Sequence, residues 1–111
     1  MKNSSFSIAR RRLDWSKRAT TDQLAIVRHY LETASESVAW DCFLEIGSNL
    51  ERIALLGLKF RAGTHDTLEC VLKQFPYIIV YRITARTVRV VRVLHQRRAY
   101  FNRSQETPCT H

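Results

Sequence analysis

Two blocks of apolar residues near the end of the chain, 77–83 and 88–94, predict a pair of neighbouring strands. Polar residues 84–87 separate the blocks, where a hairpin can turn. The first block is apolar at both odd and even positions, which is typical of a central strand covered on both faces. In the second block Arg89 and Arg92 have opposite parity. Either one of these arginines lies under a cover, or a β-bulge resets the register.

Two amphipathic helices are predicted before these strands, in residues 20–34 and 38–56. Thr20 has the spacing of a capping box at the start of the first helix, and Gly57 lies where a left-handed residue would end the second. The apolar stripes are Leu24, Val27, Leu31 and Ala34, and Ala39, Cys42, Phe43, Ile46, Leu50, Ile53 and Leu56. The short break between the helices predicts an antiparallel hairpin whose two stripes face the sheet. Gly47, inside the second helix, suggests a close crossing of the two helices.

The remaining segments complete an α+β fold. Residues 10–16 alternate apolar and polar positions and predict a basic edge strand, and residues 68–72 predict another strand. The predicted order is β-α-α-β-β-β, with the helical hairpin packed on one face of a small antiparallel sheet. Residues 10–101 are expected to form a single domain, preceded by a disordered leader, 1–9, and followed by a flexible tail, 102–111.

Charge is unevenly distributed along the chain, whose formal net charge is +8. Residues 73–103 contain eight Lys or Arg and no acid, whereas residues 20–57 contain six of the ten acids and only two Arg. The predicted sheet is therefore basic and the helical hairpin is acidic. A basic face attracts an anionic partner and speeds the encounter with it. The alternative is that this charge only keeps the protein soluble.

No cofactor, metal or membrane contact is predicted. The three cysteines lack the spacing of metal ligands, and Cys42 and Cys70 lie among apolar neighbours, as small core residues do. No apolar run approaches the ~20 residues of a membrane span, and the first residues lack the apolar stretch of a secretory signal. A cytoplasmic protein is expected.

The candidate functional residues are basic or aromatic, because the sequence has no Ser-His-Asp set, carboxylate pair or phosphate-binding loop. Arginine can stabilise the charge that develops in a phosphodiester reaction, and His or Tyr can move its protons. The candidates for catalysis are His95, Arg98, Tyr100 and Arg82, with His65 as a further possibility. The candidates for binding a target or nucleic acid are Lys59, Arg61, Arg82, Arg92, Arg97 and Arg98. The alternatives are a structural His95, plain surface charge at Arg97 and Arg98, and a hydrophobic latch formed by Tyr100 and Phe101.

Two segments of this pattern are distinctive, PYIIVYRI at 76–83 and VRVVRVLHQRRAYF at 88–101. An earlier set consists of Leu13, Trp15, Ser16, Ala19 and Asp22, followed by the apolar residues Leu24, Val27, Tyr30 and Leu31. With these features the chain resembles the RelE/ParE toxins of bacterial type II toxin–antitoxin systems over residues 10–101. One departure is the pair Leu68-Glu69, where members of this family commonly carry Arg-Glu.

The resemblance implies a growth-inhibiting toxin of a plasmid-stabilisation module, bound by a cognate acidic antitoxin in a toxin–antitoxin hetero-oligomer. The LHQRR ending at residues 94–98 looks more like the ParE branch, which implies poisoning of DNA gyrase without an enzymatic reaction. The alternative is the RelE branch, a ribosome-dependent mRNA endoribonuclease that would use the catalytic candidates. A third hypothesis, from charge alone, is a non-catalytic nucleic-acid-binding protein or a decayed toxin. The antitoxin is expected to close the second face of the sheet.

Overall fold

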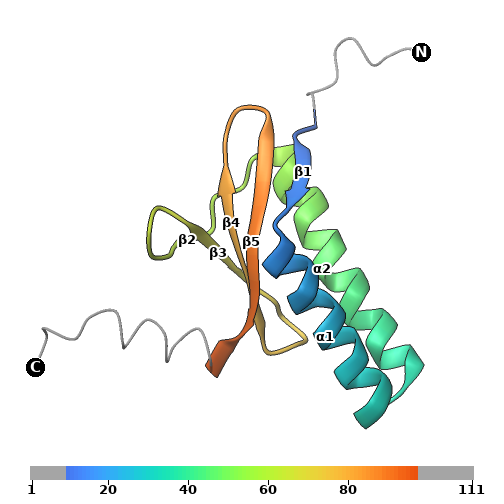
Figure 1. The fold of residues 1–111 in the computed structure, drawn as a ribbon. Coiled ribbons are helices and arrows are strands. Elements are labelled where there is room, and N and C mark those ends of the chain that lie inside the picture. Colours follow the sequence, from blue (N-terminus) through green and yellow to red (C-terminus); the bar gives the residue numbers. More distant parts are fainter. Residues whose placement is uncertain (1–9, 98–111) are drawn as a thin grey trace, which may run out of the picture.

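Two helices lie side by side against one face of a five-stranded sheet (Figure 1). This computed structural model describes residues 10–97. The elements are β1 (Arg12–Trp15), α1 (Lys17–Thr33), α2 (Glu36–Leu56), β2 (Arg61–Ala62), β3 (Leu68–Val71), β4 (Tyr77–Ile83) and β5 (Thr87–His95). The order across the sheet is β1-β5-β4-β3-β2. The predicted α+β fold with a helical hairpin on one face is confirmed, whereas the predicted leader and tail lie outside the described residues.

The sheet is mixed, not antiparallel as predicted. β1 is an edge strand, as expected, but it pairs with β5 in parallel, with Leu13 opposite Val88. A parallel pair needs a long connection between its strands, and here the helical hairpin and three further strands lie between β1 and β5. The two-residue strand β2, which was not predicted, extends the other edge by pairing with β3. Neither described helix is long and apolar enough to cross a membrane.

Helix α1 begins one turn before its predicted start at Thr20. The N-cap is Ser16, whose hydroxyl accepts a hydrogen bond from the backbone N–H of Ala19 at 3.0 Å. Thr20 instead lies inside the helix and donates its own hydroxyl to the Ser16 carbonyl. Helix α2 begins after Ser35, which caps Val38 in the same way.

The predicted end of α2 is confirmed. Gly57 adopts the left-handed conformation with φ of 67°, and its N–H donates to the carbonyl of Ile53 at 2.8 Å. Only glycine takes this conformation without steric cost. The chain therefore leaves the helical hairpin at a fixed angle and enters the edge of the sheet.

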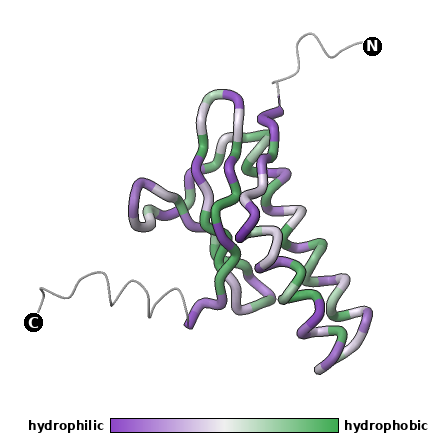
Figure 2. The backbone as a smooth tube through the Cα atoms, in the orientation of Figure 1, coloured by the Kyte–Doolittle hydropathy of each residue, from purple (hydrophilic) through white to green (hydrophobic). Residues whose placement is uncertain are grey.

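The core lies between α2 and the central strands. Ile46, Leu50 and Ile53 of α2 are fully buried against Ile79 and Tyr81 of β4 and the valines of β5, and Figure 2 shows hydrophobic positions along these elements. Cys42 and Cys70 are buried as well, as predicted. Burial raises the pKa of the Cys42 thiol to about 11, so this thiol stays protonated at neutral pH.

Both alternatives for the arginines of β5 are present, because a β-bulge resets the register and Arg92 is mostly buried beside Asp22 of α1. Val80 pairs with Arg92 and Tyr81 with Val90, so Val91 has no partner on β4. The extra residue changes the parity, and Val93 points into the core together with Val90. The register is reset by the bulge.

The second face of β4 is covered only in part. Ile78 is buried there and Val80 is half-buried, but Arg82 is exposed. No described helix lies on this face (Figure 1). The prediction of a strand covered on both faces is therefore wrong for the half of β4 that carries Arg82.

The apolar stripe of α1 does not face the sheet as predicted. Its buried residues are Ala19 and Ile26, whereas Leu24 and Leu31 are exposed. Gly47 does not mark a crossing of α1 and α2 either. A Cβ atom at this position would meet no heavy atom within 4 Å, apart from the backbone of its own helix turn. The two observations show that the outward side of the hairpin is left open.

Gly47→Ala is expected to stabilise the chain, because alanine removes the entropic cost of a glycine in a helix, about 0.5–1 kcal/mol, and fits the open space. The melting temperature, measured by circular dichroism, should rise by several degrees. Gly57→Ala is the matched control. It should lower the melting temperature, because its φ of 67° costs a side chain about 1–2 kcal/mol. A lower melting temperature for Gly47→Ala would contradict the open surface over that residue.

Candidate functional site

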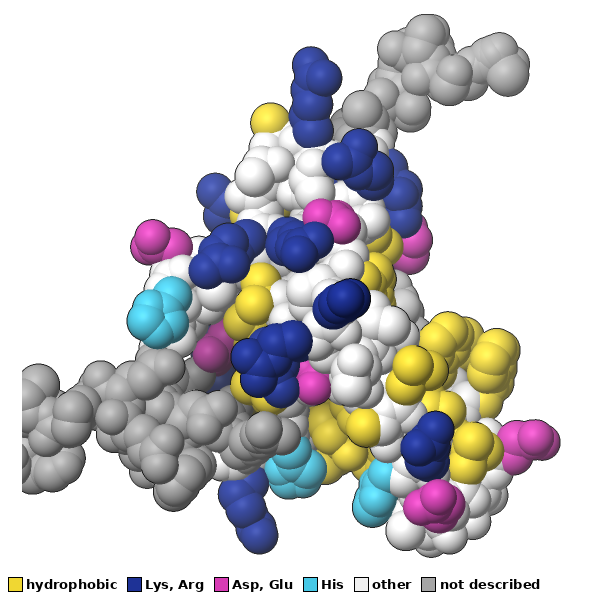
Figure 3. All heavy atoms as spheres, in the orientation of Figure 1, with side chains coloured by type: hydrophobic (Ala, Val, Ile, Leu, Met, Phe, Trp, Pro, Cys, Tyr) yellow, Lys and Arg dark blue, Asp and Glu magenta, His cyan; other side chains and the backbone are white. Residues whose placement is uncertain are grey.

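The helix-free side of the sheet carries a row of charged side chains, which we call the open sheet face. Its central members follow from the register, in which Asp14 lies opposite Arg89 and Arg89 opposite Arg82. Arg12 shares this side, because it alternates along β1 with Leu13, which packs against the core. Figure 3 shows Lys and Arg gathered over the sheet, whereas hydrophobic side chains gather over the helical hairpin.

Arg82 and Arg89 are direct cross-strand neighbours, an arrangement that like charges normally disfavour. Each guanidinium has a partner that compensates for this. Arg89 Nη1 donates to Asp14 Oδ2 at 2.6 Å, and Arg82 Nη2 donates to the backbone carbonyl of His65 at 3.0 Å. The side chain of Arg12 has no ion pair within the described residues. With three guanidinium groups and one carboxylate, the open sheet face has a positive net charge.

Arg61 is held by a buried carboxylate at the β2–β3 edge. Its Nε donates to Glu69 Oε1 at 2.9 Å, and the Glu69 side chain is 7% exposed. Glu69 follows Leu68 in β3. The neighbouring strand β2 supplies the guanidinium that pairs with Glu69. Arg61 therefore holds β2 to β3.

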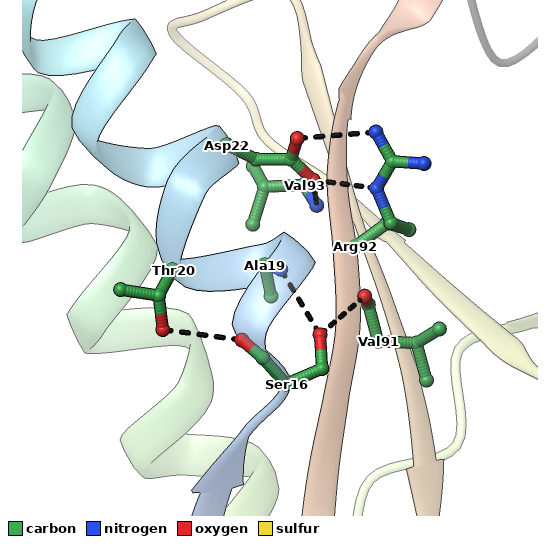
Figure 4. Close-up of polar contacts among 7 residues, drawn as sticks. All are labelled: Ser16, Ala19, Thr20, Asp22, Val91, Arg92 and Val93. Carbon is green, nitrogen blue, oxygen red and sulfur yellow. Dashed lines mark hydrogen bonds and ion pairs between the residues drawn. The ribbon is translucent and has the colours of Figure 1, made fainter.

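Arg92 is held by Asp22 of α1 (Figure 4). The carboxylate accepts Nε at 2.7 Å and Nη2 at 3.1 Å, and it also accepts the backbone N–H of Val93 at 3.0 Å. Both side chains are mostly buried, and the hydrogen-bonded carboxylate raises the pKa of Arg92. Arg92 thus fixes α1 to the sheet, and its guanidinium is engaged by Asp22.

The same turn of α1 closes an edge of β5. β1 ends at Trp15, so β5 has no neighbouring strand on that side beyond Val90. Ser16 occupies this edge instead, and its N–H donates to the Val90 carbonyl. Its hydroxyl donates to the Val91 carbonyl at 2.8 Å (Figure 4). Asp22 receives the next free donor, Val93 N–H. Three polar groups of this edge, the carbonyls of Val90 and Val91 and the N–H of Val93, are therefore satisfied without another strand.

His95 lies at the end of β5 on the helix side of the sheet. Its ring is 5.5 Å from that of Tyr77 in an edge-on contact, and its Nδ1 accepts the backbone N–H of Arg97 at 3.1 Å. Arg82 points from the opposite face, five residues along β4 from Tyr77, which corresponds to roughly 17 Å. One phosphate group cannot contact both Arg82 and His95. The other catalytic candidates, Arg98 and Tyr100, lie outside the described residues.

The remaining candidates lie in loops or at strand ends. Lys59 is exposed in the α2–β2 connection, which the Tyr81 hydroxyl holds by donating to the Leu58 carbonyl at 2.7 Å. His65 is in the β2–β3 turn with φ of 53°, and Arg97 is exposed beyond β5. Among residues 10–97 no group of three or more His, Cys, Asp and Glu side chains is arranged to hold a metal ion.

Sequence reasoning missed Arg12, Asp14 and Arg89 as members of the face, and Asp22 as its support. The alternation along β1 was a signal for Arg12 and Asp14, since Leu13 and Trp15 had to point inward. No local signal identified Asp22 as a partner of Arg92, because the two residues lie 70 positions apart.

Comparisons with known proteins agree with this architecture. Residues 13–100 match the family described as the ParE toxin of the type II toxin–antitoxin system, parDE. The fold is similar to a solved chain of the chromosomal ParDE TA system from P. aeruginosa, with a TM-score of 0.68 and 17% sequence identity over 77% of this chain and 95% of that chain. No curated protein sequence matches. Because the family match extends from β1 to beyond the end of β5, the chain belongs to the ParE toxin family of type II toxin–antitoxin systems.

Proposed function

We propose that this ParE-family toxin stops bacterial growth by poisoning DNA gyrase in the cytoplasm and that the open sheet face binds the target. The observation that carries the proposal is the adjacent pair Arg82 and Arg89. Together with Arg12, these residues give the face three positive charges against the one negative charge of Asp14. Guanidinium groups bind carboxylates and phosphates with paired hydrogen bonds. The face therefore suits an acidic protein surface or DNA held by the enzyme, and Lys59, Arg97 and Arg98 are proposed to extend the contact.

RNA cleavage receives less support from the geometry. The separation of Arg82 and His95 on opposite faces leaves these two candidates unable to act on one phosphate. Arg61 and Arg92 already form structural ion pairs with Glu69 and Asp22. We therefore propose a non-enzymatic inhibitor, which acts by binding.

Neutralisation by an acidic antitoxin is proposed at the same face. An acidic segment that orders on the sheet would compete with the target for Arg82 and Arg89 and would cover the exposed half of β4. Charge would also steer the encounter, given the net charge of +8. The product would be a toxin–antitoxin hetero-oligomer in which the toxin cannot reach gyrase.

The variant Arg82→Ala/Arg89→Ala is expected to lose gyrase inhibition while it stays folded. A hydrogen bond to a charged group is worth on the order of 1.5–3 kcal/mol, so the concentration for half-inhibition of supercoiling should rise at least tenfold. Stability should change by only ~0.5 kcal/mol, because both side chains are exposed. The control is Arg28→Ala/Arg52→Ala, which removes the same charge from exposed positions on the helices.

Supercoiling and cleavage-complex assays with purified gyrase, run beside an assay of mRNA integrity on translating ribosomes, distinguish the functions. Unaffected gyrase with cleaved mRNA would replace the proposal by the ribosome-dependent ribonuclease. Equal losses in both double variants would show that general charge, and not the open sheet face, determines inhibition.

Antitoxin binding should weaken steeply as salt rises, because exposed charge pairs are screened over a Debye length of about 8 Å at physiological ionic strength. The probe is the acidic protein encoded by the adjacent reading frame, titrated by calorimetry at several salt concentrations. Arg82→Ala/Arg89→Ala should bind it at least tenfold more weakly. An affinity that is independent of both salt and this substitution would exclude the open sheet face as the antitoxin site.

A further inference from the structure

Four exposed arginines gather at the end of the sheet where a turn joins β4 to β5. Arg82 and Arg89 lie opposite each other on these two strands, and Arg12 lies on β1 opposite Thr87. Arg86 is in the turn itself, and its carbonyl accepts the backbone N–H of Arg12 at 2.9 Å. Figure 3 shows Lys and Arg side chains over this end of the sheet. We call Arg12, Arg82, Arg86 and Arg89 the arginine patch.

The arginine patch has an excess of positive charge. Asp14 is the only acid in β1, β4, β5 and the β4–β5 turn, and it lies 2.6 Å from Arg89 Nη1. The side chains of Arg12 and Arg86 form no ion pair within residues 10–97. Four guanidinium groups against one carboxylate leave a net charge of +3 at this end of the sheet. Such a concentration of charge attracts an anion that carries several charges.

Hydrogen bonds fix the turn that carries Arg86. Thr84 Oγ1 accepts the backbone N–H of Thr87 at 3.0 Å, and the Thr84 carbonyl accepts Arg11 Nε at 2.8 Å. The backbone N–H of Arg11 donates to the carbonyl of Ala54, near the end of α2. The backbone under the patch is therefore in place before a ligand binds, which lowers the entropic cost of binding.

The composition of this surface differs from that of a protein–protein interface. The core of such an interface is poor in charged residues and rich in aromatic ones. Among residues 10–97 the large apolar side chains that are exposed come from the two helices, from Phe60 and from Val71, and none comes from β1, β4 or β5. Interfaces with DNA are more polar and much more positively charged, as this end of the sheet is.

The spacing of the arginines favours duplex DNA over an acidic peptide. Arg12 and Arg82 are two strands apart and two residues out of register, which corresponds to roughly 12 Å. An extended peptide presents a side chain to one face about every 6.7 Å, so it places at most about three carboxylates over that span. Duplex DNA carries one negative charge per about 1.7 Å of its axis, or about seven over the same span.

The shape of the sheet favours contact with the backbone of a duplex and not with its bases. Proteins that bind single strands stack the bases on exposed aromatic rings, but no exposed Trp, Tyr or Phe lies on β1, β4 or β5, all within the described residues. The backbones of β1 and β4 lie about 10 Å apart on either side of β5. The major groove, about 12 Å wide, admits a ribbon of two strands, so these three strands with their arginines are too broad to enter it.

We propose that the arginine patch binds the phosphate backbone of duplex DNA without reading its sequence. Guanidinium groups donate paired hydrogen bonds to phosphate oxygens, and contacts to phosphates alone carry no sequence information. The inference deepens the proposed function and rests on it in naming the DNA held by gyrase as the bound segment. An acidic antitoxin segment on the open sheet face would exclude this DNA, because both ligands need Arg82 and Arg89.

The test measures binding of the full chain to labelled duplexes by fluorescence anisotropy, without gyrase. Two unrelated sequences of about 20 base pairs should bind with equal affinity. The logarithm of the association constant should fall with the logarithm of the salt concentration with a slope of about −3.6, since each of four neutralised phosphates contributes about −0.9. A single strand of the same sequence and a polyglutamate with the same number of charges should bind at least tenfold more weakly.

The variant Arg12→Ala/Arg86→Ala removes two arginines of the patch and leaves Arg82 and Arg89 in place. The salt slope should become less steep by about 2, one for each lost phosphate contact, and the affinity for the duplex at low salt should fall at least tenfold. The control Arg28→Ala/Arg52→Ala removes the same charge from exposed positions on the helices. Its salt slope should stay the same. Circular dichroism confirms that both variants are folded.

The outcomes separate this inference from the proposed function. A toxin that inhibits gyrase through Arg82 and Arg89 but binds no free duplex would overturn the DNA contact while the proposed function stands. Equal changes in the two double variants, or tighter binding of the single strand or of polyglutamate, would also overturn it. Duplex binding with the expected slope beside unaffected gyrase would support the DNA contact and overturn the proposed function alone.

Discussion

The carboxylate of Asp22 connects the helical hairpin to the sheet, and the arrangement of the open sheet face depends on it. It binds a guanidinium and a backbone N–H of consecutive residues, Arg92 and Val93, next to the bulge of β5. These are charge-assisted hydrogen bonds in a mostly buried site. Removal of one partner from such a pair costs on the order of 3–5 kcal/mol, because the other charge is left buried without compensation. The bulge and the start of α1 are thereby fixed relative to each other.

This connection also gives the sheet a closed edge where β1 is too short to pair. Ser16 caps α1 with the same hydroxyl that donates to the Val91 carbonyl. One side chain therefore serves both the helix end and the strand edge. β1 pairs with β5 as far as Val90, and beyond that point Ser16 and Asp22 bond the polar groups of Val91 and Val93. Along this stretch the chain therefore presents no free β5 edge to another protein.

The sequence was sufficient for the elements whose signals are local. The parity of residues 77–83 identified β4, and Gly57 identified the end of α2. The parallel pairing of β1 with β5 was not predictable, because it joins segments about 75 residues apart and the alternation along β1 fits either direction. The start of α1 was misplaced, since Thr20 and Ser16 are both good caps and only contact with β5 favours Ser16.

The sequence was sufficient to predict that the site is basic, but not which residues form it. The number of Lys and Arg residues identified the sheet as basic. Whether an arginine is available to bind a partner depends on whether an acidic residue from elsewhere in the chain already forms an ion pair with it. Arg61 is engaged by Glu69 and Arg92 by Asp22. Arg89 emerged only from the register, in which it shares a row with Arg82.

The β2–β3 turn has a consequence for how Arg82 would meet a ligand. His65 and Asp66 both have positive φ, and the His65 carbonyl accepts a hydrogen bond from the Arg82 guanidinium. This bond restricts a long side chain to few rotamers before any ligand arrives, while Nη1 and Nε are left to donate elsewhere. Ordering a flexible side chain at an interface costs roughly 0.5–1.5 kcal/mol. Arg82 is preorganised, so much of that entropy is already lost in the free toxin.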